Sequence, residues 1–209
     1  GIASRGLGDV YKRQVISKEF KDQYLSNPKH PNVFECKAIV FEGPEDYHKR
    51  LNDKKLKVNE NSILIIRGCG PVGYPGSAEV VNMQPPDRLL KKGIRHLPTL
   101  GDGRQSGTSE SPSILHVSPE SAVGGDLGIV KTYDKIKIDL NKRRVDLLIS
   151  QAEFKKRRKN KKVFKPNNQT PWQEIFRNTV GQLDDGACIN SRGKYLDVSH
   201  TKGLPRDSH

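Results

Sequence analysis

Two glycine-rich segments of the 209-residue chain hold the side chains best suited to chemistry. GCGPVGYPGSAEV, residues 68–80, contains Glu79, and GDGRQSGTS, residues 101–109, contains Ser106. Glycine lets backbone amides approach a ligand closely, and clustered amides can hold an anion. A carboxylate from one loop and a hydroxyl from the other could form a metal site beside a base; the alternative is that both are ordinary turns. Neither is a phosphate-binding P-loop, because no Lys-Ser/Thr pair follows the second glycine.

Strands must position these loops. SILIIR is nearly all apolar and predicts a strand buried on both faces. KIKIDL and RRVDLLI alternate apolar and polar residues about Asn141-Lys142, which predicts a hairpin. The predicted strands cover residues 36–41, 62–67, 113–117, 135–140 and 143–149. Short strands joined by glycine-rich loops, with few helices, predict a mainly β fold of the α+β class, with a β-barrel-like or sandwich body.

Helices are expected at residues 45–53, 87–94 and 170–183. In the last of these, Thr170 is a candidate N-cap and Pro171 takes the first helical position. Its apolar residues can share one helical face: Trp172, Ile175, Phe176, Val180 and Leu183. We interpret Trp172 as a core residue or a docking anchor of this helix.

The chain is expected to divide into four parts. Residues 1–14 include SRGLGDVYKRQ, which is similar to a translated sequencing adapter; we exclude them as an artefact or a disordered end and expect a chain truncated at its N-terminal side. Residues 15–150 form the barrel-like domain, and residues 151–169 a basic linker or helix. Residues 170–209 supply a C-terminal helix and tail that pack on the same domain.

Composition excludes several classes of protein. The hydrophobic share is 33% and no apolar run approaches the ~18 residues of a membrane-spanning helix, so a transmembrane protein is excluded. Three separated cysteines without a C-x-x-C pair argue against a disulfide scaffold or a zinc knuckle. The net charge of +13 comes largely from FKKRRKNKKVFK, residues 154–165, and this tract leaves open a nucleic-acid-binding module as an alternative.

Several ordered motifs together resemble one family. IRGCGPVGYPGSAEV, GDGRQSGTS, ILHVSPESAVGG and IDLNKRRVDLLIS are similar to the C-terminal domain of the dihydroxy-acid and sugar-acid dehydratases. FEGPEDYHKRLND, TPWQEIFRNTVGQLDDGA and the ending KGLPRDSH also resemble it, so the resemblance covers about residues 15–209. The sequences of these segments resemble the sugar-acid dehydratases more closely than the dehydratase of branched-chain amino acid biosynthesis.

The resemblance implies a hydro-lyase that dehydrates a 2,3-dihydroxy acid to a 2-keto acid with an iron–sulfur cluster and a divalent cation, usually Mg²⁺. It implies that Ser106 acts as the alkoxide base and Glu79 as a metal ligand, with Arg104, Gly107 and Thr108 binding substrate. A structural ion pair is an equally open reading of Arg104. The family pattern has Met-Pro before the glutamate, whereas this chain has Ser77-Ala78.

The resemblance also implies what the chain lacks. The family's cluster cysteines and remaining metal carboxylates lie in an N-terminal domain, so this chain is expected to be inactive alone. We assign no cluster ligation to its three cysteines: Cys36, Cys69 and Cys188. The family suggests a homodimer or tetramer. We expect a cytoplasmic or mitochondrial location, with any targeting segment in the missing N-terminal part.

Two further interpretations stay open at this point. His116 is expected to lie on the strand 113–117 in a structural role. The whole chain could also be a structural β-domain that contributes packing only, in which case Ser106 would not be a base.

Overall fold

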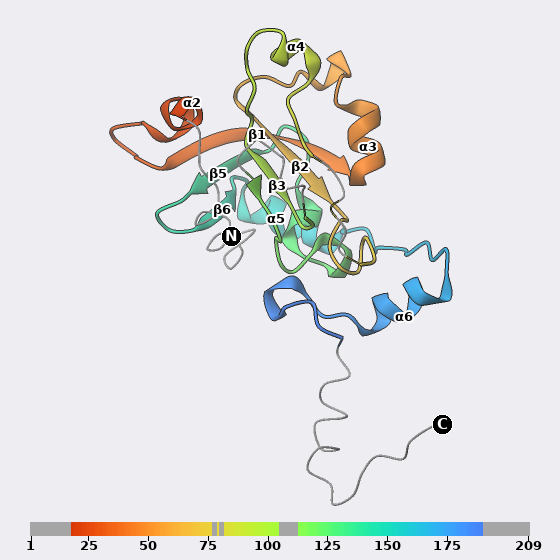
Figure 1. The fold of residues 1–209 in the computed structure, drawn as a ribbon. Coiled ribbons are helices and arrows are strands. Elements are labelled where there is room, and N and C mark those ends of the chain that lie inside the picture. Colours follow the sequence, from red (N-terminus) through yellow and green to blue (C-terminus); the bar gives the residue numbers. More distant parts are fainter. Residues whose placement is uncertain (1–17, 77–78, 80–81, 105–112, 190–209) are drawn as a thin grey trace, which may run out of the picture.

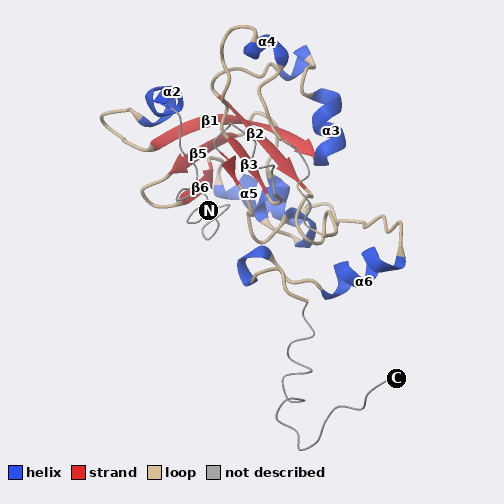
Figure 2. Cartoon of the chain, in the orientation of Figure 1, coloured by secondary structure: helices blue, strands red, loops and turns tan. Residues whose placement is uncertain are grey.

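A computed structural model describes residues 18–76, 79, 82–104 and 113–189. Within them, a mixed six-stranded sheet curls into a half-barrel in the order β4-β3-β2-β1-β5-β6 (Figures 1 and 2). Its strands are β1 (Val33–Glu42), β2 (Ser62–Arg67), β3 (Thr99–Gly101), β4 (Ser113–Ile114), β5 (Lys135–Asp139) and β6 (Arg144–Leu147). β1 to β4 run parallel to one another, whereas β5 is antiparallel to both β1 and β6.

The two central strands carry the core. Alternate residues of a strand point to opposite faces, and both faces of β1 and β2 are covered. Ile63 and Ile65 pack with β5 and with the segment before β1, whereas Leu64 and Ile66 pack under α3. This explains why SILIIR is apolar at nearly every position, as the sequence predicts.

The helices are short and lie around the sheet. They are α2 (Lys18–Phe20), α3 (Gly43–Arg50), α4 (Asp87–Leu90), α5 (Gln151–Lys159) and α6 (Pro171–Thr179). A π-helical turn η1 (Lys21–Leu25) and 3-10 turns η2 (Lys54–Leu56), η3 (Ser121–Val123), η4 (Asp126–Ile129) and η5 (Leu183–Asp185) complete the elements. α6 lies away from the sheet (Figure 1). In the described part of the chain, no helix is long and apolar enough to cross a membrane.

Most of the sequence predictions are confirmed. The mainly β, α+β class, the hairpin and the strand at 62–67 all appear. The basic segment begins as a helix, with the Ser150 hydroxyl accepting from the Glu153 amide at 3.2 Å. The Thr170 hydroxyl likewise accepts from the Gln173 amide at 3.3 Å, which confirms it as the N-cap of α6.

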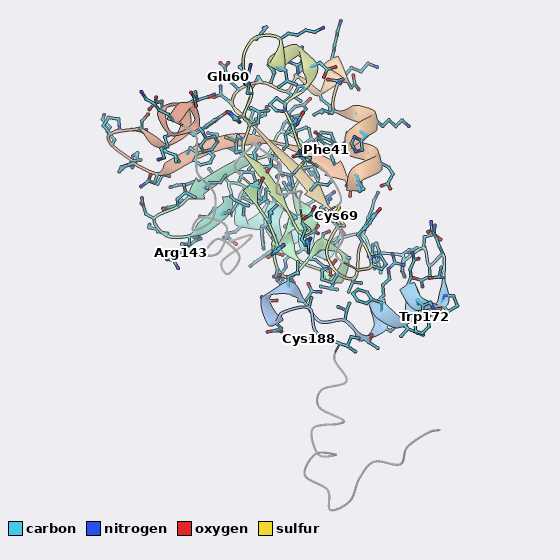
Figure 3. The ribbon with its side chains drawn as sticks, in the orientation of Figure 1. Phe41, Glu60, Cys69, Arg143, Trp172 and Cys188 are labelled. Carbon is cyan, nitrogen blue, oxygen red and sulfur yellow. The ribbon has the colours of Figure 1, made fainter. Side chains whose placement is uncertain are left out.

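Three predictions need correction. The strand at 113–117 ends at Ile114, and His116 has a left-handed backbone (φ 59°) that a regular strand cannot accommodate. Trp172 is not a core residue, because 77% of it is exposed; Figure 3 shows it at the periphery, far from the sheet. The helix predicted at 170–183 also ends early, at Thr179.

Candidate active site

The first glycine-rich loop leaves the sheet at the carboxyl end of β2. Gly68 has φ 76°, which an L side chain rarely adopts. A Cβ on Gly73 would lie 2.5 Å from the Gly68 carbonyl oxygen, so the chain folds back on itself with no room for a side chain. The loop is therefore a tight, backbone-lined turn, as its composition predicts.

The second glycine-rich loop packs directly on the first. It follows β3, the parallel neighbour of β2, so both loops leave the same edge of the sheet. A Cβ on Gly103 would lie 2.4 Å from the Cys69 carbonyl oxygen. The glycines of the two loops thus permit a backbone-to-backbone approach that larger residues would block.

Asp102 joins these loops through its side chain. The carboxylate is fully buried and accepts hydrogen bonds from the amides of Gly68 (3.1 Å), Cys69 (2.9 Å) and Ser121 (2.9 Å). It also accepts from the Ser121 hydroxyl at 2.6 Å. Hydrogen bonds to a buried charge compensate its lost hydration, so one carboxylate holds the first glycine loop to η3.

Glu120 supports the same loop at residues further along the chain. It is 1% exposed and accepts from the amides of Val72 (2.9 Å) and Gly73 (2.8 Å). Gln182 closes the arrangement: its amide nitrogen donates to the Glu120 carboxylate at 2.9 Å, and its oxygen accepts from the Glu120 backbone amide at 2.8 Å. Burial raises the pKa of Glu120, and the hydrogen bonds from Val72 and Gly73 oppose that rise.

Glu79 and Arg104 meet where the two loops extend beyond the sheet. They form a parallel β-bridge, and Arg104 Nη2 donates to Glu79 Oε1 at 3.0 Å. Both side chains are about half exposed, at 47% and 48%. The structure therefore brings together two of the residues that the sequence selects, and it shows the ion pair that was one reading of Arg104.

The other selected residues lie outside the described part of the chain. Ser106, Gly107 and Thr108 fall in the segment 105–112, so their roles stay predictions. Ser106 follows Arg104 by two positions.

The described residues offer one carboxylate suited to a metal at this place and no cysteine set for a cluster. Glu79 is a hard oxygen donor of the kind that Mg²⁺ prefers. Within the described ranges, no group of three His, Cys, Asp or Glu side chains could enclose a metal ion. Cys69 is buried in the first glycine loop, near the ends of the strands (Figure 3), and burial, aided by the charge of Asp102, raises the pKa of its thiol.

Sequence reasoning missed Asp102 and Glu120, although both lie inside motifs that it quotes. A signal was available: each is an acidic residue within a short Gly- or Pro-rich loop that follows an apolar strand. Such an acid is suited to accept the unpaired amides of a neighbouring turn. Which turn it supports depends on the tertiary fold.

Comparison with known proteins decides the family. Residues 21–187 match the family model described as dihydroxy-acid/6-phosphogluconate dehydratase C-terminal. The chain belongs to this family. It is 54% identical over 200 residues to a D-xylonate dehydratase from Caulobacter vibrioides. The aligned region covers 96% of this chain and 33% of the relative.

Other relatives of this dehydratase domain are more distant. An L-arabinonate dehydratase from Rhizobium leguminosarum is 38% identical, covering 86% of this chain and 30% of the relative. A dihydroxy-acid dehydratase from Thermodesulfovibrio yellowstonii is 39% identical, and the match covers 75% of this chain and 28% of the relative. The dehydratase domain described here thus spans about a third of the length of these curated relatives.

Proposed function

We propose that this chain supplies the C-terminal part of a hydro-lyase that dehydrates a sugar acid to a 2-keto-3-deoxy acid. The observation that carries the proposal is the meeting of Glu79 and Arg104 where two glycine loops leave parallel strands. The 54% identity to a D-xylonate dehydratase favours a sugar acid such as D-xylonate over a branched-chain dihydroxy acid, because the dihydroxy-acid dehydratase is only 39% identical.

In this proposal, Ser106 removes the proton from C2 of the substrate. The electron pair of the C2–H bond forms a C2–C3 double bond, and the C3 hydroxyl leaves as water after gaining a proton. The resulting enol becomes the 2-keto acid when C3 takes up a proton and the C2 hydroxyl releases its proton. The net change is the loss of one water, with no oxidation or reduction.

The residues of this chain would prepare that step electrostatically. Serine is a poor base in water, so it needs positive charge nearby to favour the alkoxide. Arg104, two positions before Ser106, supplies one such charge, and it can also bind the substrate carboxylate. Asp102 and Glu120 keep the two loops rigid, which reduces the reorganisation needed during reaction.

The proposal assigns Glu79 to a divalent cation, with Gly107 and Thr108 contacting substrate. A bound Mg²⁺ would polarise substrate oxygens, and an iron–sulfur cluster would supply a Lewis acid for the departing hydroxyl. We propose that the cluster ligands come from an N-terminal domain, which completes the site in a dimer or tetramer. The isolated chain should then be inactive.

A hybrid enzyme tests the proposal. The matching third of the Caulobacter D-xylonate dehydratase is replaced by residues 15–209 of this chain, and 2-keto acid formation from D-xylonate is measured. The isolated chain is assayed in parallel. Activity in the hybrid alone supports the proposal; a folded hybrid without activity, or activity in the isolated chain, contradicts it.

The nucleic-acid alternative receives little support from the geometry. Arg157 pairs with Asp134 and Glu153, Arg158 pairs with Asp126 at 3.0 Å, and Lys161 donates to the Gly125 carbonyl oxygen. Three of the eight cations of the tract are therefore held by their own domain, which leaves fewer charges for a phosphate backbone.

A further inference from the structure

An open pocket of about 770 Å³ lies at the carboxyl ends of β1 and β2. Its walls come from the start of α3, the first glycine loop, the turn after η4, and the chain from α5 to Lys165. This volume lies in the range of small-molecule sites. Neither Glu79 nor Arg104 lines the pocket.

The lining of the pocket is strongly cationic. Three carboxylates face seven basic side chains. The carboxylates are Glu42, Glu45 and Glu153, and the basic residues are Arg67, Lys131, Lys156, Arg157, Lys161, Lys162 and Lys165. Because like charges focused in a concave surface raise the local potential, such a pocket attracts anions.

Arg67 is fixed in the floor of the pocket. Its side chain is 17% exposed and donates to the carbonyl oxygens of Leu127 (3.2 Å), Gly128 (3.0 Å) and Val130 (2.8 Å). It also pairs with Glu42 through Nε, at 3.0 Å to Oε2. Most N–H donors of Arg67 are therefore already bonded to groups of the domain itself.

Lys161 and Arg157 are fixed as well. A Cβ on Gly128 would lie 2.7 Å from Lys161 Cε, so the lysine lies flat against a glycine backbone and donates to Gly125. Arg157 is 11% exposed and pairs with Asp134 and Glu153. These two side chains build the wall of the pocket.

Three lysines of the lining differ from these fixed cations. Lys156, Lys162 and Lys165 are exposed, and in the described part of the chain none of them forms an ion pair. Their side chains are long and mobile, and their ammonium groups are free to meet a ligand at the mouth of the pocket.

The segment that carries two of these lysines is anchored beside the glycine loop. The Arg177 guanidinium lies 5.9 Å from the centre of the Phe164 ring and donates to the Val72 carbonyl oxygen at 2.8 Å. Phe164 and Tyr74 both line the pocket. Arg177 thus holds the end of the basic tract against the pocket, which concentrates its charge there.

We propose that this pocket binds a small multivalent anion, bearing phosphate or several carboxylate groups, through Lys156, Lys162 and Lys165. Arg67, Arg157 and Lys161 contribute positive electrostatic potential, and the three exposed lysines contact the anion directly. The anion is small because the cations converge on one hollow, whereas a nucleic acid needs a continuous track of charge.

Titration calorimetry on the 209-residue chain at low ionic strength tests this site. Tripolyphosphate and citrate are the probes, and they distinguish a phosphate ligand from a polycarboxylate. Saturable binding of either at one site per chain is expected. Lys156→Gln/Lys162→Gln should weaken it by about tenfold, because two contacts to the anion are lost.

The control is Lys155→Gln/Lys159→Gln. These lysines belong to the same tract and give the same change in net charge, but they do not line the pocket. The control should change the affinity by about twofold or less, since the charges are screened at a distance. Equal weakening in both variants, or no saturable binding, would overturn the proposal. An oligonucleotide that displaces the probe equally well from both variants would also overturn it.

Discussion

Arg104 Nη2 lies 3.0 Å from Glu79 Oε1, although 25 positions separate the two residues in the chain. A parallel β-bridge between the same residues fixes their backbones side by side. The acid-bearing loop and the hydroxyl-bearing loop of the sequence therefore approach one another at one edge of the sheet. The proposed site depends on this approach.

Removal of the Arg104 charge should barely change the stability of the domain. Both partners are about half exposed, and such ion pairs contribute about 0–1 kcal/mol. We expect Arg104→Gln to change the free energy of unfolding in urea by less than about 1 kcal/mol. Arg67→Gln is the matched control and should lose about 2–4 kcal/mol, because three carbonyl oxygens lose a buried donor. Equal losses in both variants would be inconsistent with these environments.

Asp102→Asn should strongly destabilise the domain. Asparagine keeps one acceptor oxygen, but its amide nitrogen can only donate, so at least one of the amides of Gly68, Cys69 and Ser121 would lose its partner in a buried place. The expected loss in a urea titration is about 2–4 kcal/mol. Asp22→Asn, at an exposed position, should stay within about 0.5 kcal/mol of the parent. A loss below about 1 kcal/mol at Asp102 would show that the loops do not depend on this carboxylate.

Glu120 should make the domain less stable as the pH rises above the ordinary glutamate range. Burial raises its pKa in the folded state, so the fold binds a proton that the unfolded chain releases first. Its stabilising contribution is complete below the unfolded pKa and is lost as the pH rises through the folded pKa. The free energy of unfolding of the parent, minus that of Glu120→Gln, should therefore fall as the pH rises above the pKa that Glu120 has in the unfolded chain. A difference that grows with pH would contradict this assignment.

The cysteines should differ sharply in reactivity. Cys36 and Cys69 are buried, and burial raises the pKa of Cys36 to about 12 and also raises that of Cys69. Cys188 is exposed. Iodoacetamide should therefore label one cysteine rapidly in the native chain, and Cys188→Ser should abolish that labelling. Rapid labelling of the Cys188→Ser variant would show that a buried thiol is accessible.

Local patterns were sufficient to predict several elements of this fold, but not β3 (Thr99–Gly101). An all-apolar SILIIR requires cover on both faces, and the alternation on either side of Asn141-Lys142 fits only a hairpin, so both were predictable. The capping side chains of Ser150 and Thr170 act on amides three positions away, which is also local information.

Long-range packing was not predictable in the same way. His116 sits in an apolar run, yet contacts with the second glycine loop, including its amide donating to Gly103 at 3.3 Å, hold it in a left-handed conformation. The apolar face of α6 predicts burial, but Trp172 is exposed, since periodicity does not say what covers a face. Glu79 and Arg104 could be selected from the sequence, whereas their contact comes from the parallel order of β2 and β3.

A double-mutant comparison in the hybrid dehydratase tests the central claim most directly. The turnover of D-xylonate is measured for Glu79→Gln, Ser106→Ala and the double variant, with Ser109→Ala as a control from the same loop. If both residues serve one reacting centre, each single variant should lose at least about 100-fold, and the double variant should lose far less than the product of the two. Ser109→Ala should keep most of the activity. Turnover within a few-fold of the parent in Ser106→Ala or in Glu79→Gln would contradict the account.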